Sequence, residues 1–197
     1  MSRLGPPNLT LRGRHVTLVP LDRAHAEALG DASAEGRMQD IWYTAIPSPG
    51  GMLAEIDRRL RLRDLGAMLP FTQLDARGTP VGMTSYSNID HATPRVEIGS
   101  TWLAPRAQRG PINTEAKRLL LGHAFDVWNC LAVEFRTHRL NQTSRRAIER
   151  LGAQLDGVLR AHMKMPNGTI RDTAVYSITS TDWPVVRAHL DGLMARK

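Results

Sequence analysis

The chain has 197 residues, of which 42% are hydrophobic and 23% are charged, and its formal net charge is +7. This length and composition are typical of one globular domain that buries a core without disulfides or a structural metal. No apolar run reaches the ~18 residues of a membrane span, and the start lacks the apolar stretch of a signal peptide. We therefore expect a single cytoplasmic domain over residues 1–197, with a loosely held segment over residues 1–10.

Arginine supplies nearly all of the positive charge, because Lys117, Lys164 and Lys197 are the only lysines among 26 basic residues. The densest basic run, residues 57–64 (DRRLRLRD), alternates arginine with leucine and is typical of a solvated helix face. A nucleic-acid surface would carry interleaved aromatic side chains, and this run has none, so we do not expect a nucleic-acid partner. The single cysteine, Cys130, is interpreted as a packed small hydrophobe. The histidines show no metal-ligand spacing, so no metal is expected.

In chain order, hydrophobic periodicity and turn residues predict a sequence of strands and helices. The predicted elements are a strand over 14–21, a helix from Asp22 to about Ser33, a loop over 40–51, a helix over 52–65, a strand over 69–75, a hairpin of strands over 80–90 and 95–105, a helix over 114–128, a strand over 132–138, a helix over 141–152 ended by Gly152, a hairpin of strands over 153–165 and 171–178, and a helix over 182–193. This order predicts a mixed α/β (α+β) fold with a central, mostly antiparallel sheet flanked by helices.

The stretch APRAQRGPIN, residues 104–113, carries Arg106 and Arg109 directly before a predicted helix. Free backbone N–H groups and the helix dipole would favour an anion such as a diphosphate there, although an ordinary basic loop has the same appearance. The Walker and G-x-G-x-x-G patterns are absent, which argues against a nucleoside triphosphatase or an NAD-binding protein. We expect Glu115 to serve the helix dipole or a cap. The periodicity predicts an outward helix face made of Lys117, Arg118, Gly122 and Asp126.

The order of elements and three segments, VEIGSTWLAP, QRGPIN and TEAKRLLLGHAF, resemble the GCN5-related N-acetyltransferases (GNAT), most closely the bacterial ribosomal-protein alanine acetyltransferases. The most specific part is Asn141 followed by Ser144, with Gly152 eleven residues after Asn141. The resemblance covers about Arg12 to Trp183. It implies a homodimeric N-acyltransferase that moves an acetyl group from acetyl-CoA directly to a primary amine, either of a protein N-terminus or of a small molecule. A non-catalytic CoA-binding or interaction module on the same fold is the alternative.

In enzymes of this family the loop after this strand has the pattern Q/R-x-x-G-x-G/A, and its amides bind the pyrophosphate of acetyl-CoA. Here Gln108 opens the pattern, Pro111 takes the first small position and Asn113 takes the second. If position 111 needs a positive φ, proline disturbs the loop; at a helix entrance its missing N–H costs little. We expect a working loop in which Gly110 supplies flexibility and Asn113 caps the helix.

The resemblance also implies the remaining contacts of acetyl-CoA, with backbone N–H groups of the strand bonding the pantetheine and polarising the thioester. Gly99 would permit a close approach or a bulge. The implied cofactor-binding residues are Ile98, Gly99, Thr101, Trp102, Leu103, Gln108, Arg109, Gly110, Ile112, Asn113, Thr114, Asn141 and Ser144.

Acyl transfer needs a base, because an ammonium group must lose a proton before it attacks a thioester. The resemblance implies Glu97 as this base; the alternative is an ion pair in the hairpin. Many relatives use a tyrosine seven residues after the asparagine to protonate the leaving thiolate, but that position is Ile148 here, so Ser144 is the candidate acid. The alternative for Asn141 and Ser144 is a helix cap. The implied substrate-binding residues are Trp42, Tyr43, Tyr86 and Glu97, although single aromatic residues also occur in cores.

Overall fold

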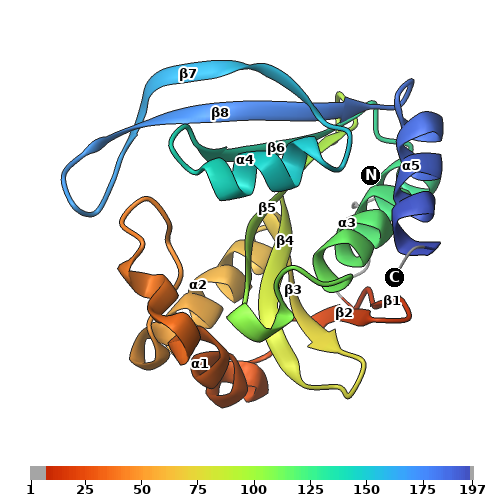
Figure 1. The fold of residues 1–197 in the computed structure, drawn as a ribbon. Coiled ribbons are helices and arrows are strands. Elements are labelled where there is room, and N and C mark those ends of the chain that lie inside the picture. Colours follow the sequence, from red (N-terminus) through yellow and green to blue (C-terminus); the bar gives the residue numbers. More distant parts are fainter. Residues whose placement is uncertain (1–7, 196–197) are drawn as a thin grey trace.

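The computed structural model describes residues 8–195, which form one eight-stranded sheet with helices on both faces (Figure 1). The strands are β1 (Leu11–Arg12), β2 (Val16–Pro20), β3 (Met68–Asp75), β4 (Pro80–Asp90), β5 (Arg95–Leu103), β6 (Ala132–His138), β7 (Gln154–Lys164) and β8 (Ile170–Thr179). The helices are α1 (Ala26–Ala34), α2 (Met52–Asp64), α3 (Ile112–Gly122), α4 (Gln142–Glu149) and α5 (Trp183–Ala195). The strand order is β1-β2-β3-β4-β5-β6-β8-β7. All neighbouring strands are antiparallel except β5 and β6, so the predicted mixed fold is confirmed.

The local signals in the sequence account for most element boundaries. The Asp22 side chain accepts from Ala24 N, as a helix-capping aspartate should, and Gly152 ends the α4 segment with a φ of 97°. Helix α3 begins at Ile112, two residues before the predicted start, and continues into a π-type turn over His123–Val127. Of the ten residues expected to be loose, residues 1–7 lie outside the described range, whereas Leu9 packs against the core.

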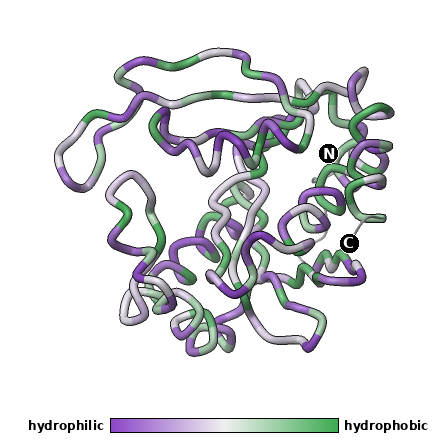
Figure 2. Tube along the Cα trace, viewed as in Figure 1, coloured by the Kyte–Doolittle hydropathy of each residue, from purple (hydrophilic) through white to green (hydrophobic). Residues whose placement is uncertain are grey.

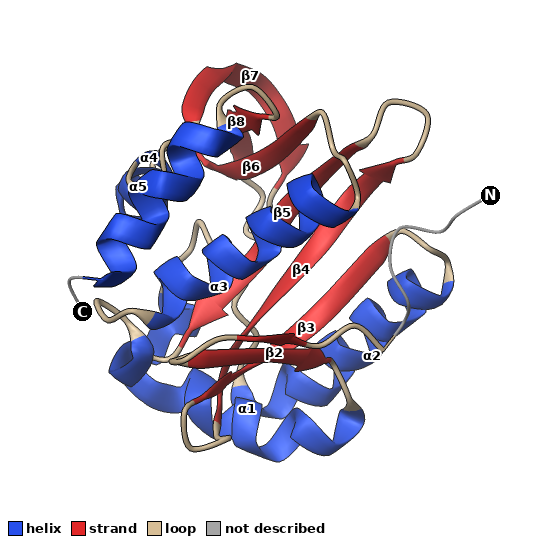
Figure 3. Cartoon of the chain, turned by 90° about the vertical axis from the view of Figure 1, so that its right-hand side faces the viewer, coloured by secondary structure: helices blue, strands red, loops and turns tan. Residues whose placement is uncertain are grey.

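Two apolar cores lie on opposite faces of the sheet, as Figure 3 shows with α1 and α2 on one face and α3 and α5 on the other. The larger core contains Leu120 and Leu121 of α3, with side chains from α4 and α5. The smaller core joins α1 and α2 to Met83 and Trp102. Figure 2 shows hydrophobic and hydrophilic residues mixed along these helices. This pattern is typical of a helix that packs one of its faces against a sheet and exposes the other. The buried Cys130 belongs to the larger core, which confirms its interpretation as a packed hydrophobe.

The parallel pair of strands opens partway along its length, and this opening positions the site. Strands β5 and β6 are paired from Arg95 opposite Ala132 to Glu97 opposite Glu134, and not beyond. Farther along β5, Ser100 and Thr101 lie opposite one residue of β4, because Gly99 pairs with Ser85 and Trp102 with Met83. Ser100, in this bulge, has a φ of 50°. We call residues 99–101 the β5 bulge.

Helix α3 is more deeply buried than its sequence predicts. Glu115, expected to serve the helix dipole, instead accepts hydrogen bonds from the backbone N–H groups of Arg14, His15 and Val16, at 2.9, 2.6 and 2.8 Å. It therefore ties the β1–β2 turn to α3. Lys117 and Gly122, expected to face outward, are also buried. The outward prediction is wrong for them because α3 is covered by the sheet on one side and by α5 on the other.

No helix in the described range is long and apolar enough to cross a membrane. The same residues contain no group of three or more His, Cys, Asp or Glu side chains that could hold a metal ion.

Replacing Glu115 by alanine should destabilise the fold by roughly 3 kcal/mol, because three backbone donors lose a charged acceptor. The melting temperature should then fall by about 6–12 °C for a chain of this size. Glu27→Ala, at an exposed position in the first turn of α1, is the matched control and should cost less than about 1 kcal/mol. Urea and thermal unfolding measure both variants, and equal losses would contradict the role assigned to Glu115.

Candidate active site

Two buried cations hold the β5 bulge from opposite faces of the sheet. From α2, Arg59 Nη1 donates to the carbonyl oxygen of Ser100 at 3.1 Å and to Ser85 Oγ at 3.3 Å. From α3, Lys117 Nζ donates to Thr101 Oγ1 at 2.7 Å and to Thr84 Oγ1 at 3.1 Å. The bulge is thus fixed at the point where β5 and β6 separate.

The two cations differ in how their charge is balanced. Arg59 is 2% exposed, and its Nε lies 2.7 Å from Glu55 Oε1. Its burial corrects the prediction that the basic run 57–64 forms an entirely solvated face. Lys117 is 5% exposed and has only hydroxyl partners among the described residues. Burial lowers the pKa of Lys117 from 10.5 to about 7.

Pro111 fits the loop before α3, because its φ of −73° is close to the value that its ring imposes. It lies at the N-cap of the helix, where a missing N–H costs little. The positive φ falls instead on Arg109, at 59°, and not on Gly110. Asn113, expected to be the cap, lies inside the first turn, and the helix has no side-chain cap. The first-turn N–H groups therefore remain available to an anion.

Several polar side chains near this loop support the loop itself. The Gln108 amide donates to the carbonyl oxygen of Leu103 at 2.8 Å, which fastens the loop to the end of β5. Arg106 pairs with Glu35 and donates to the carbonyl oxygen of Pro80. Thr114 Oγ1 accepts from Arg150 at 2.8 Å. Arg109 is exposed and forms no ion pair with a described residue, so its guanidinium is open to solvent.

The strand residues implied in cofactor binding divide into two groups. Ile98 is buried in the larger core, Trp102 in the smaller core, and Leu103 in a separate small apolar cluster. These residues can therefore offer only backbone atoms to a ligand. Thr101 is exposed. At Gly99, which borders the β5 bulge, a Cβ would come within 2.6 Å of Glu97 Oε1. A glycine at this position leaves room for the Glu97 carboxylate.

The Asn141–Ser144 step forms a helix cap. Asn141 Oδ1 accepts from Ser144 N at 3.0 Å, at the start of α4. This is the structural alternative given above for Asn141. The hydroxyl of Ser144 is partly exposed and forms no hydrogen bond with another described residue. Ile148, at the position of the tyrosine in many relatives, is buried in the larger core.

Glu97 lies just before the β5 bulge, with its side chain 13% exposed. Asn88 Nδ2 donates to its Oε2 at 2.6 Å, and Arg136 Nε lies 3.8 Å from the same oxygen. Burial is the largest influence and raises the pKa of Glu97, while Arg136 and Asn88 act in the opposite direction. The result is a carboxylate that binds a proton more readily than an exposed glutamate.

Aromatic rings from the α1–α2 loop face the end of β6. The ring centroid of Trp42 lies 5.4 Å from that of Tyr43 and 5.3 Å from that of His138. His138 did not emerge from the sequence, since a lone histidine at a strand end carries no signal of its own. Tyr86, expected at the substrate, lies instead in the larger core, where its hydroxyl donates to the carbonyl oxygen of Leu120.

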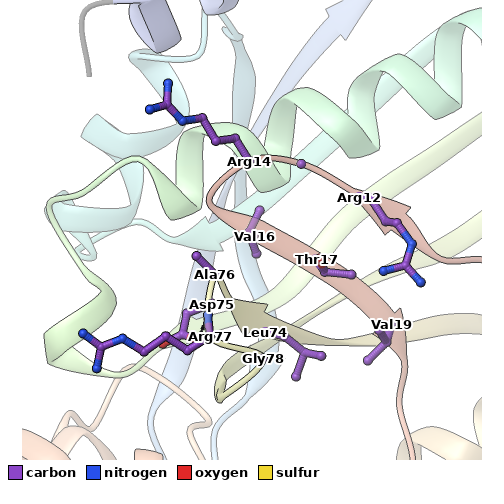
Figure 4. Close-up of a pocket in the computed structure, with 11 residues that line it drawn as sticks. Arg12, Arg14, Val16, Thr17, Val19, Leu74, Asp75, Ala76, Arg77 and Gly78 are labelled. Carbon is purple, nitrogen blue, oxygen red and sulfur yellow. Dashed lines mark hydrogen bonds between the residues drawn. The ribbon is translucent and has the colours of Figure 1, made fainter.

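A hollow of about 550 Å³ lies away from these residues, between the β1–β2 hairpin and the β3–β4 turn (Figure 4). Arg12, Arg14 and Arg77 are among its lining residues, and none of the residues expected at the site lines it.

Comparison with known proteins gives consistent matches. The family described as "Acetyltransferase (GNAT) domain" matches residues 15–154. YdaF of Bacillus subtilis, named as a candidate ribosomal N-acetyltransferase, is 27% identical over 175 residues, covering 86% of this chain and 93% of YdaF. A GCN5-related N-acetyltransferase from Brucella melitensis is 31% identical with a TM-score of 0.85, covering 96% of this chain and 86% of its own. The fold is also shared by Mycobacterium smegmatis RimJ, solved in complex with CoA-disulfide, at 23% identity and a TM-score of 0.78, covering 95% of this chain and 94% of its own.

The lowered pKa of Lys117 predicts a pH-dependent stability. Between about pH 7 and pH 10.5 the unfolded chain binds a proton at this position that the folded chain does not, so folding becomes more favourable as the pH rises. Relative to Lys117→Met, the wild-type free energy of unfolding should increase by up to about 1.4 kcal/mol per pH unit in this window. Urea unfolding at pH 7, 8 and 9.5 measures the difference.

The control for this prediction is Lys164→Met, which removes an exposed lysine of β7. Its free energy of unfolding should run parallel to that of the wild type at all three pH values. If the free energy of unfolding of Lys117→Met also ran parallel to that of the wild type, the lowered pKa of Lys117 would be contradicted.

Proposed function

The chain belongs to the GNAT acetyltransferases, and from this premise we propose that it transfers an acetyl group from acetyl-CoA directly to a primary amine, of a protein N-terminus or of a small molecule. The observation that carries the proposal is the Glu97 carboxylate, held beside the opening between β5 and β6 with a raised pKa. The name of YdaF supports a protein N-terminus as one candidate acceptor. A homodimer in the cytoplasm is part of the proposal, supported by the exposed apolar side chains along the edge strand β7.

Acetyl-CoA, when bound, supplies the acetyl group as a thioester whose carbon accepts the amine and whose sulfur departs as a thiolate. The residues that would hold its pyrophosphate are Arg109, Gly110, Ile112 and Asn113, at the uncapped start of α3. The backbone of the β5 bulge and the exposed Thr101 would face its pantetheine arm. The RimJ structure with CoA-disulfide supports this assignment at the level of the shared fold.

Two side chains of this protein would move protons. Glu97 takes a proton from the acceptor ammonium, which frees the nitrogen lone pair for attack. The Ser144 hydroxyl gives a proton to the departing sulfur and regains one from solvent. Asn88 and Arg136 favour the ionised form of Glu97, because both lower its pKa against the effect of burial.

Glu97→Gln should lower kcat by roughly 10²- to 10⁴-fold, since general-base catalysis contributes about that much. It should also abolish the loss of activity that we expect in the wild type as the pH falls through the raised pKa of Glu97. Asn88→Gly should move that loss to higher pH, because it removes a hydrogen bond that lowers this pKa. Glycine is chosen because Asn88 has a φ of 47°. A pH–rate profile unchanged in both variants would remove Glu97 from the role of base.

Acetyl-CoA should raise the melting temperature by several degrees, because a ligand at about 100 times its Kd stabilises the folded state by about 2.7 kcal/mol. Thermal-shift measurements with acetyl-CoA, CoA and ATP test this. Arg109→Ala should reduce the shift by removing the exposed guanidinium before α3, whereas Arg77→Ala, on the β3–β4 turn, is the control. The absence of any shift with acetyl-CoA would favour a module that has lost its cofactor.

A further inference from the structure

A row of charged and polar side chains runs across β5, β6 and β8 on one face of the sheet. In the register of the parallel strands, Glu97 of β5 lies opposite Glu134 of β6. Along β6, Glu134 and His138 alternate with residues whose side chains belong to the larger core. His138 lies opposite Thr173 of β8, and Arg171 Nε donates to Thr173 Oγ1 at 2.9 Å. We call Glu97, Glu134, Arg136, His138 and Arg171 the polar row.

Arg171 differs from the arginines around it. Arg95 and Arg136 both pair with Glu134, and Arg139 and Arg160 both pair with Asp172. Within residues 8–195 the partly buried Arg171 has no carboxylate within the 4.0 Å of an ion pair. The carboxylate whose charge affects the pKa of Arg171 is that of Glu97. Burying a guanidinium without a direct counter-charge is costly, which marks this position as one that an anion can occupy.

His138 supplies a second donor without a partner. The residue is 5% exposed, and its Nδ1 accepts from Leu140 N at 3.0 Å, so the neutral ring carries its hydrogen on Nε2. That Nε2 is buried and has no hydrogen-bond partner among the described residues. Arg171 and Arg139 both disfavour a charged ring, and burial does so more strongly, lowering the pKa of His138. The ring is therefore a neutral donor that could bond an anionic oxygen.

The carboxylate of Glu97 and the guanidinium of Arg171 influence each other but do not touch. Each shifts the pKa of the other toward its charged form, yet their N and O atoms stay beyond ion-pair distance. Two opposite charges held apart in a partly buried site match a molecule that carries the same two charges in the reverse order. A zwitterion placed between them would satisfy both ends at once.

We propose that the acceptor is a small amine that carries a carboxylate close to its amino group, as an α-amino acid does. This inference rests on the proposed function and narrows its acceptor. The ammonium of the acceptor binds Glu97, and its carboxylate binds Arg171 and His138 Nε2–H. Trp42, 48% exposed, and Tyr43 offer aromatic surface to the rest of the molecule. A peptide N-terminus would bring a neutral carbonyl to Arg171 and leave the guanidinium unpaired.

The experiment measures kcat/KM by CoA release with matched acceptors: the free amino acids phenylalanine, leucine and methionine, their carboxamides, and the corresponding amines without the carboxyl group. A short peptide with the same first residue completes the set. The free amino acids should exceed the carboxamides, amines and peptides by roughly 100-fold or more, because a site built for a charged group strongly disfavours an analogue that lacks it.

Arg171→Gln should remove this preference, lowering kcat/KM for the free amino acids by about 100-fold while leaving the amines within a few-fold of wild type. Arg171→Lys should restore part of it. Arg160→Gln, which removes an exposed arginine of the same hairpin, is the matched control and should leave the preference unchanged.

The outcomes separate this inference from the proposed function. If peptides or amines were acetylated as efficiently as the amino acids, and this turnover depended on Glu97, the inference would be overturned. The proposal of acyl transfer would remain intact. An equal loss for all acceptors in Arg171→Gln would also overturn it, since the residue would then act through the fold. No turnover of any acceptor, despite acetyl-CoA binding, would overturn both.

Discussion

The geometry of the site depends on the β5 bulge and on the two cations that hold it. Ser100 takes a φ of 50°, which costs free energy in a residue with a side chain, and it does so where β5 has just lost its pairing with β6. Arg59 bonds the carbonyl oxygen of Ser100 from one face and Lys117 bonds the Thr101 hydroxyl from the other. Because both donors come from helices that pack on the sheet, the separation of the strands is a consequence of the whole fold.

The two cations also explain why each helix is anchored where it is. Arg59 follows Met52 and Ile56 on the buried face of α2, and Lys117 precedes Leu120 and Leu121 on the buried face of α3. The buried apolar side chains of each helix supply favourable free energy of burial. The cation on the same face of each helix extends its side chain to the β5 bulge. Lys117 lacks a carboxylate partner, and its lowered pKa is the physical sign that burial there opposes the charge. Hydroxyl partners suit it, because Thr84 and Thr101 can bond either the charged or the neutral amine.

Periodicity was sufficient to predict the order of elements and the mostly antiparallel sheet, since each strand and helix carries its own local pattern. It failed for Lys117 and Arg59 because charged residues were taken to face solvent. Their spacing of three or four residues from buried Ile56, Leu120 and Leu121 held the correct signal. Tyr86 was misplaced because β4 is buried on both faces, so its sequence does not show which face a side chain takes. The placement of His138 near Arg171 depends on the register of β6 and β8, which sets His138 opposite Thr173 and which no single segment contains.

The charges of the polar row connect acceptor binding to base strength. In the structure, Arg171 helps to hold the pKa of Glu97 down, together with Arg136 and Asn88, against the effect of burial. An acceptor carboxylate bound to Arg171 would offset the positive charge that Glu97 feels from that side. The ammonium of any acceptor would lower the pKa of Glu97, but an acceptor with a carboxylate would lower it less than an amine without one. Before binding, the same arginine favours the ionised form of Glu97, the form that can accept a proton from the ammonium.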